Sequence, residues 1–168
     1  MKLAVISDTH DHKDNILKAV SIMNERNVDA LIHCGDYVAP FVKRWFDGLK
    51  TNIKKNFYGV WGNNDGERVF LMQNLGQICN IVGMEINNDF DGRRVFAAHM
   101  PTQETIDALA NSKKYDIILS GHTHAVVNKK YENGVLVINP GEACGYLSGK
   151  ATFAIIDTDK MIAEIIEL

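Results

Sequence analysis

Four short polar clusters in this chain have the residue types and the spacing of metal ligands. Each lies at the end of a strand-like apolar stretch and offers carboxylate or amide oxygens or imidazole nitrogens, which are donors that transition metals accept in proteins. Because the ends of several strands can meet at one rim of a fold, the sequence predicts a metal site built from distant segments. The clusters are Asp8-Thr9-His10, Gly35-Asp36, Gly62-Asn63-Asn64-Asp65 and Gly121-His122-Thr123-His124.

Each cluster taken alone also has an ordinary structural explanation. An Asp-x-His segment can be a helix cap followed by a surface histidine. Gly-Asp and Gly-Asn-Asn-Asp-Gly are rich in turn residues. The most specific pair is His122 and His124, because side chains two positions apart in an extended segment share a face; the alternative is two exposed histidines at a strand end.

Three further histidines need an assignment. His99 ends the apolar segment 94–98, so we interpret it as a ligand, with a buried structural histidine as the alternative. His33 belongs to a buried strand pattern and is expected to pack inside the protein or beside the ligands. His12 is expected at an exposed helix start.

Composition narrows the class of protein. A chain of 168 residues is long enough to bury a sizeable core, so we expect one domain, residues 1–168. The net charge of −3 and the lack of a Lys/Arg run disfavour nucleic acid and anionic membranes as partners. Three cysteines without C-x-x-C spacing argue against a disulfide framework and favour a reducing cytoplasm. Neither a signal peptide nor an apolar run of membrane-spanning length is recognisable.

The elements that must position these clusters can be predicted from hydrophobic periodicity. The first half alternates strands and helices, which favours parallel pairing. In the helix 41–49 we expect Phe41, Val42, Trp45, Phe46 and Leu49 to face inward. Strands are predicted at 3–7, 30–33 and 57–61, and helices at 15–24, 41–49 and 67–75.

The second half is dominated by hairpin patterns. Asp91-Gly92 and Asn133-Gly134 are turn sequences that join antiparallel strands. Together with the first half, these patterns predict an α/β fold of two mixed sheets flanked by helices. The expected strands are 84–86 with 94–98, 117–120, 126–131 with 135–138, and 151–156 with 161–166, and a helix is expected at 103–111.

Taken in order, the clusters resemble the calcineurin-like metallophosphoesterase superfamily. Its pattern is D-x-H, G-D, G-N-H-D/E, a lone His and G-H-x-H, and the short chain is most similar to the small single-domain phosphodiesterases of bacteria and archaea. The resemblance implies a four-layer α/β/β/α sandwich. The sequence departs from the pattern at Asn64, where most members carry histidine.

The resemblance also implies the ligand set and the reaction. Asp36 would bridge two divalent ions, and a hydroxide held by the metals would attack the phosphorus of a small phosphodiester. Mixed nitrogen and oxygen ligation suits Mn, Ni, Fe, Co or Zn better than Mg or Ca, with Mn or Ni favoured by the resemblance. One ion would be held by Asp8, His10 and His124, and the other by Asn63, His99 and His122.

Asn64 bears on substrate preference. In relatives with G-N-H, the histidine is thought to stabilise the transition state or to protonate the leaving oxygen, a role worth about 10² to 10⁴ in rate. An asparagine donates a hydrogen bond but no proton, so we expect good leaving groups or diesters to be preferred. We therefore place Asn64 with Asp36 among the catalytic residues, and Asn64, Thr123 and Gly141 beside the substrate.

The sequence is also compatible with other functions. The vacuolar sorting subunit of the retromer coat resembles these phosphodiesterases and serves as a scaffold, so a protein-interaction role is one alternative. Phosphomonoesterase and nuclease activities are others. Self-association through an edge strand or through the helix around Trp45 and Phe46 is also left open, although both are expected to belong to the core.

Overall fold

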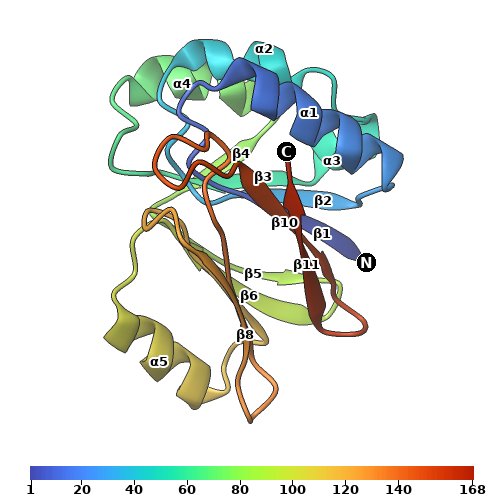
Figure 1. Ribbon diagram of the computed structural model, residues 1–168, viewed down its shortest axis with the longest axis vertical. Coiled ribbons are helices and arrows are strands. Elements are labelled where there is room, and N and C mark those ends of the chain that lie inside the picture. The colour runs from blue at the N-terminus through green and yellow to red at the C-terminus, as the bar shows by residue number, and fades with distance from the viewer.

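The computed structural model describes residues 1–168, which form two packed β-sheets with helices on both outer sides (Figure 1). Sheet A has six strands in the order β11-β10-β1-β2-β3-β4. The pairs from β1 to β4 are parallel, while β10 runs antiparallel to both β1 and β11. Its strands are β1 (Lys2–Ile6), β2 (Ala30–His33), β3 (Phe57–Val60), β4 (Asn80–Gly83), β10 (Thr152–Asp157) and β11 (Ile162–Glu167).

Sheet B has five strands in the order β5-β6-β7-β9-β8. Two antiparallel hairpins, β5–β6 and β8–β9, flank the central strand β7, which is parallel to both β6 and β9. Both sheets are therefore mixed, as predicted. The strands are β5 (Glu85–Phe90), β6 (Arg93–Ala98), β7 (Ile117–Leu119), β8 (Val126–Lys130) and β9 (Leu136–Pro140).

The helices lie on opposite outer sides of the two sheets. Figure 1 shows α1 to α4 above sheet A and α5 alone below sheet B. No helix is long and apolar enough to cross a membrane. The α-helices are α1 (Lys13–Glu25), α2 (Lys43–Phe46), α3 (Thr51–Lys55), α4 (Arg68–Asn74) and α5 (Gln103–Ser112), and the 3₁₀ turns are η1 (Pro40–Val42) and η2 (Leu75–Gln77).

Three apolar clusters separate the four layers. Alternate side chains of a strand face opposite sides of its sheet. In β1, Ala4 and Ile6 pack under the helices, whereas Leu3 and Val5 pack against sheet B. A smaller cluster that includes Ile106 lies between sheet B and α5. The predicted α/β/β/α sandwich is confirmed.

Several local predictions need correction. The helix expected at 41–49 is divided into η1 and α2 and ends at Phe46, and Phe41 is 63% exposed rather than inward. Pro40 occupies the first position of η1, where its fixed φ suits the start of a helical turn. The short helix α3 and the edge strand β4 were not predicted. Strand β9 continues through Asn139 and Pro140, beyond the predicted end of the strand at residue 138.

Candidate metal centre

The seven predicted ligands follow strands of both sheets. Since β1, β2 and β3 are parallel, the loops after them emerge at one edge of sheet A. The loops after β6 and β7, which are also parallel, meet this edge from sheet B. A backbone hydrogen bond of 3.0 Å from Gly121 N to His99 O joins these two loops, and His122 N donates to Asp8 Oδ2 across the sheets at 3.0 Å.

Five of these seven residues adopt a left-handed backbone conformation, with φ between +40° and +65°. Aspartate, asparagine and histidine are the non-glycine residues most enriched in this region, yet it is uncommon for any of them. Such conformations persist where the surrounding structure enforces them, and they cluster at functional sites. The five are Asp8, His10, Asp36, His122 and His124.

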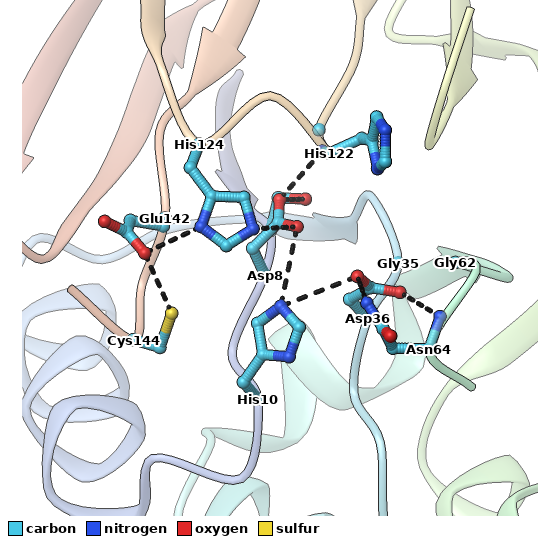
Figure 2. Close-up of polar contacts among 12 residues, drawn as sticks. Asp8, His10, Gly35, Asp36, Gly62, Asn64, His122, His124, Glu142 and Cys144 are labelled. Atoms are coloured by element: carbon cyan, nitrogen blue, oxygen red, sulfur yellow. Dashed lines mark hydrogen bonds and ion pairs between the residues drawn. The ribbon is translucent and has the colours of Figure 1, made fainter. Parts of the chain in front are cut away.

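The first half of the centre contains Asp8, His10 and His124 (Figure 2). The Nε2 atom of His124 lies 3.2 Å from Asp8 Oδ1, and the Nε2 atom of His10 lies 3.9 Å from the same oxygen. Ser7 Oγ donates to the other carboxylate oxygen at 2.5 Å, which fixes the rotation of the carboxylate. One carboxylate oxygen and two imidazole nitrogens thus converge on a single point.

The second half surrounds Asp36. Its Oδ2 atom lies 3.5 Å from His10 Nε2 and 3.4 Å from His99 Nε2, so this oxygen is shared between the two halves. His99 Nε2 is also 2.9 Å from Asn63 Oδ1. The ring centroids of His122 and His99 are 5.2 Å apart. The opposite nitrogen of His99, Nδ1, is 2.8 Å from Cys34 O, which leaves Nε2 for the centre.

Two buried polar atoms in this region lack a hydrogen-bond partner, and both are predicted ligand atoms. They are Asp8 Oδ1 and His10 Nε2. A buried polar atom without a partner costs about 1–3 kcal/mol, so native proteins rarely leave one without a reason. A cation between these atoms would satisfy both, and the donor set of carboxylates, imidazoles and one amide suits a transition metal. The residues present therefore fit the metal ions that the motifs imply.

Asp65 ties two of the ligand loops together. Its buried carboxylate accepts hydrogen bonds from the backbone N–H groups of Tyr37 at 2.7 Å and Val38 at 2.9 Å in the loop after β2. It also accepts from Gly62 N at 2.7 Å in the loop after β3. The two loops pack so closely that a Cβ atom at Gly62 would overlap Asp36 Oδ1. Asp65 therefore holds the loop after β2 against the loop after β3.

Glu142 contacts the centre, although sequence reasoning did not assign it a role. Its side chain is fully buried, and Oε2 lies 2.7 Å from His124 Nδ1. The carboxylate also accepts from the backbone N–H groups of Leu147 and Ser148 and, at 3.1 Å, from Cys144 Sγ. A carboxylate on the far nitrogen of a ligand imidazole fixes its tautomer and orientation. In the sequence, Glu142 follows the turn-rich segment Asn139-Pro140-Gly141, and no other feature of the sequence pointed to it.

The residues predicted beside the substrate lie in different surroundings. Asn64 binds Asp36, with Nδ2 donating to Oδ2 at 2.7 Å and the backbone N–H to Oδ1 at 2.8 Å. Thr123 is exposed, and its Oγ1 accepts from Asn139 Nδ2 at 3.0 Å. Gly141 is buried in a left-handed turn beside Thr152.

The two remaining histidines lie outside the centre. His33 is fully buried, with Nε2 3.1 Å from Thr9 Oγ1 and its ring centroid 3.9 Å from that of Tyr37. Burial lowers the pKa of His33 well below its usual range, which keeps the ring neutral. His12 caps α1 by accepting from Asn15 N at 3.3 Å. His33 is buried as expected, and His12 lies at the helix start as expected but is half-buried rather than exposed.

The pKa values of the two carboxylates of the centre are shifted in opposite directions. Burial raises the pKa of Asp8 above its usual value, although the Ser7 hydroxyl and the nearby histidines oppose this. Burial also acts to raise the pKa of Asp36, but hydrogen bonds from His99 and Asn64 outweigh it and hold the pKa below its usual range. For Cys144, burial raises the pKa to about 12, so this thiol stays protonated.

Comparisons with known proteins agree with the motifs. The sequence model of the family described as the calcineurin-like phosphoesterase superfamily domain matches residues 1–161. A phosphodiesterase of Methanocaldococcus jannaschii is 44% identical over 162 residues, which cover 95% of each chain. The structure of an archaeal phosphodiesterase superposes with a TM-score of 0.90 at 42% identity, over 100% of both chains. Vps29 of Entamoeba histolytica shares the fold, with a TM-score of 0.66 at 18% identity over 100% of this chain and 99% of the other.

Proposed function

The chain belongs to the calcineurin-like phosphoesterase superfamily, as predicted from its motifs, and we propose that it is a phosphodiesterase that uses two divalent metal ions. The 44% identity to an archaeal phosphodiesterase over nearly the whole of both chains supports the choice of diesters. The observation that carries the metal requirement is the pair of buried atoms without partners, Asp8 Oδ1 and His10 Nε2, at the meeting point of the ligand loops.

Asp36 is the residue that would be shared between the two ions. Its Oδ2 atom faces His10 on one side and His99 on the other. One ion would be held by Asp8, His10 and His124, and the second by Asn63, His99 and His122. Mn or Ni is our first choice of metal, with Fe, Co or Zn as alternatives, because imidazole with carboxylate and amide oxygens suits these ions.

The protein would orient the reacting groups through these ligands. When bound, two divalent ions lower the pKa of a shared water and neutralise charge on the phosphoryl group. Asp36 is held in place from the opposite side by two hydrogen bonds from Asn64. His124 is held by Glu142, and the carboxylate of Asp8 by the Ser7 hydroxyl. Each of these contacts fixes a predicted ligand in one orientation.

Asn64 sets the leaving-group preference in this proposal. No histidine occupies the position from which relatives with G-N-H would protonate the departing oxygen. The Asn64 amide is engaged by Asp36 and carries no proton that it could transfer. Esters whose leaving group departs without protonation, and diesters over alkyl monoesters, should therefore react best.

The proposal is tested by hydrolysis of bis-p-nitrophenyl phosphate and p-nitrophenyl phosphate by metal-stripped protein, with Mn²⁺, Ni²⁺ or Zn²⁺ added back. We expect metal-dependent turnover with preference for the diester, and its loss in His122→Ala. Preference for the monoester would replace the diesterase by a phosphomonoesterase. Absence of turnover with every metal would favour the scaffold alternative, in which partner binding is independent of chelator.

The proposal also covers the domain, the size of the substrate and the compartment. Residues 1–168 would act as one metallophosphoesterase domain on a small phosphodiester in the cytoplasm. The three cysteines are free and buried, in keeping with a reducing compartment. The number of protein copies in the active form can be measured by light scattering in the same metal-loaded samples.

A further inference from the structure

A pocket of about 470 Å³ lies beside the second half of the metal centre. Asn63 and His99, two of the predicted ligands, form part of its wall. A group attached to a phosphate at the centre would therefore lie next to this pocket. Asn64 does not line it.

Apolar side chains form a large part of the pocket wall, which Glu85 and Thr105 also line. The apolar side chains include those of Trp61, Phe96, Met84 and Met100. Met84 and Met100 come from different loops, before β5 and after β6, and they are 60% and 58% exposed. Methionine side chains are flexible and make favourable sulfur–aromatic contacts. Two exposed methionines that face one pocket from separate loops can close on a planar ring and remove apolar surface from water.

Arg68 provides a polar group at the same pocket. Its guanidinium carbon lies 5.4 Å from the centroid of the Trp61 ring. Nε donates to Asp65 O at 3.1 Å and Nη2 to Gly62 O at 3.3 Å, so the guanidinium is fixed by the ligand loop itself. Its other N–H groups have no partner in the protein and are free to meet a polar substituent on a bound ring.

We propose that this pocket binds a planar aromatic ester group of the substrate, on the ester that is not cleaved. The inference rests on the proposed phosphodiesterase function. In that proposal Asn64 stands beside the departing oxygen. Its amide is bound to Asp36, and it is not among the residues that line the pocket, so we assign the pocket to the retained group. The natural substrate would be a phosphodiester that carries an aryl or a nucleobase-bearing group.

The test compares diesters that share one leaving group. Methyl p-nitrophenyl phosphate, phenyl p-nitrophenyl phosphate and thymidine 5′-(p-nitrophenyl phosphate) all release p-nitrophenolate, so differences between proteins report the retained group. We expect kcat/KM to favour the phenyl over the methyl diester by about tenfold or more, as expected for burial of an aromatic ring. Phenyl and thymidine diesters distinguish an aryl from a nucleoside substrate.

The variants are Met84→Ala, Met100→Ala and the double variant, and Met72→Ala is the matched control. Met72 is also a partly exposed methionine, 46% exposed on α4, but it does not line the pocket. We expect the phenyl-to-methyl ratio to fall about threefold or more in each pocket variant and to stay unchanged in Met72→Ala. A double variant with the wild-type ratios for both the phenyl and the thymidine diester would overturn the proposal.

A binding measurement keeps the pocket testable without turnover. Trp61 lines the pocket, so in a Trp45→Phe background its fluorescence reports occupancy. We expect phenylphosphonate to quench it at lower concentration than methylphosphonate, and the double methionine variant to remove the difference. If no diester is hydrolysed with any metal, the proposed function fails, whereas equal quenching by the two phosphonates makes the pocket assignment wrong.

Discussion

Glu142 contacts a predicted ligand from outside the motifs, and its effect on the centre can be tested directly. It accepts from His124 Nδ1 and is itself held by the backbone of Leu147 and Ser148. Removal of a carboxylate that orients a ligand imidazole typically costs 10- to 100-fold in metal affinity. We therefore expect about this loss of Mn²⁺ affinity in Glu142→Ala, and a smaller loss in Glu142→Gln, which keeps an acceptor.

The measurement is competition against a metal-binding dye, with thermal unfolding of the metal-free proteins as a second readout. The matched control is Glu132→Ala, an exposed glutamate at the β8–β9 turn. A variant with wild-type affinity would contradict the role of Glu142. An equal loss in Glu142→Ala and Glu142→Gln, together with equal loss of stability, would point to a packing role alone.

Asn64 offers a test of the leaving-group hypothesis. Asn64→His supplies an imidazole, and we expect it to raise the rate on a methyl-leaving diester by about 10²-fold or more relative to a p-nitrophenyl diester. The substitution also removes the Nδ2 hydrogen bond to Asp36. Asn64→Ala removes that bond without adding an imidazole and is therefore the control. The hypothesis fails if Asn64→His and Asn64→Ala show the same ratio of rates on poor and good leaving groups.

At the scale of elements, the loops after β2 and β3 pack in direct contact. A glycine-to-alanine substitution in the second loop, which adds one methyl group, tests whether this contact is needed. A Cβ atom at Gly62 would overlap Asp36 Oδ1, whereas one at Gly66 would have no heavy atom within 4 Å. Overpacking of this kind costs about 1–3 kcal/mol of unfolding free energy. We expect Gly62→Ala to lose about this much and to bind metal weakly.

Gly66→Ala, in the same loop, should leave both quantities near their wild-type values. Urea unfolding of the metal-free proteins measures the stability, and dye competition measures the affinity. If Gly62→Ala retained wild-type metal affinity, the close packing of the two loops would not be needed to place Asp36.

Sequence periodicity predicted most elements but not all of them. The strands β2 and β7 are short and fully buried, and β1 is buried after Lys2. The D-G and N-G turns mark the hairpins of sheet B. Strand β4 was missed because only Ile81 of its four residues is buried. Helix α3 has five residues and one buried side chain, which is too short for a periodic pattern.

The ligand residues of the candidate site could be predicted because they belong to motifs that occur in a fixed order along the chain. The order of the strands, in which β10 lies between β11 and β1, follows from long-range pairing that no local pattern encodes. For the same reason the contact between Glu142 and His124 was not predicted, since it joins two loops 18 residues apart. The pocket beside His99 depends on loop shapes, which periodicity does not describe.

For the whole molecule, the origin of the ligands has a consequence for stability. Asp8, His10, Asp36 and Asn63 follow strands of sheet A, while His99, His122 and His124 follow strands of sheet B. Bound metal would thus connect the two sheets across their shared edge. Unfolding separates the sheets and destroys the site, so a ligand that binds only the folded protein raises the free energy of unfolding.

We therefore expect Mn²⁺ or Ni²⁺ to raise the Tm of metal-stripped protein in a concentration-dependent way. At 100 times Kd the gain is about 2.7 kcal/mol, which for a chain of this length corresponds to roughly 5–10 °C. Calorimetry with and without chelator measures it. His122→Ala and His10→Ala, which remove ligands on the two sides of Asp36, should each reduce the shift, while Met72→Ala should not. Binding to the native state alone must raise its stability. If no metal changed the Tm, and if both histidine variants also kept the same Tm with and without metal, the seven residues would not hold ions in the folded protein.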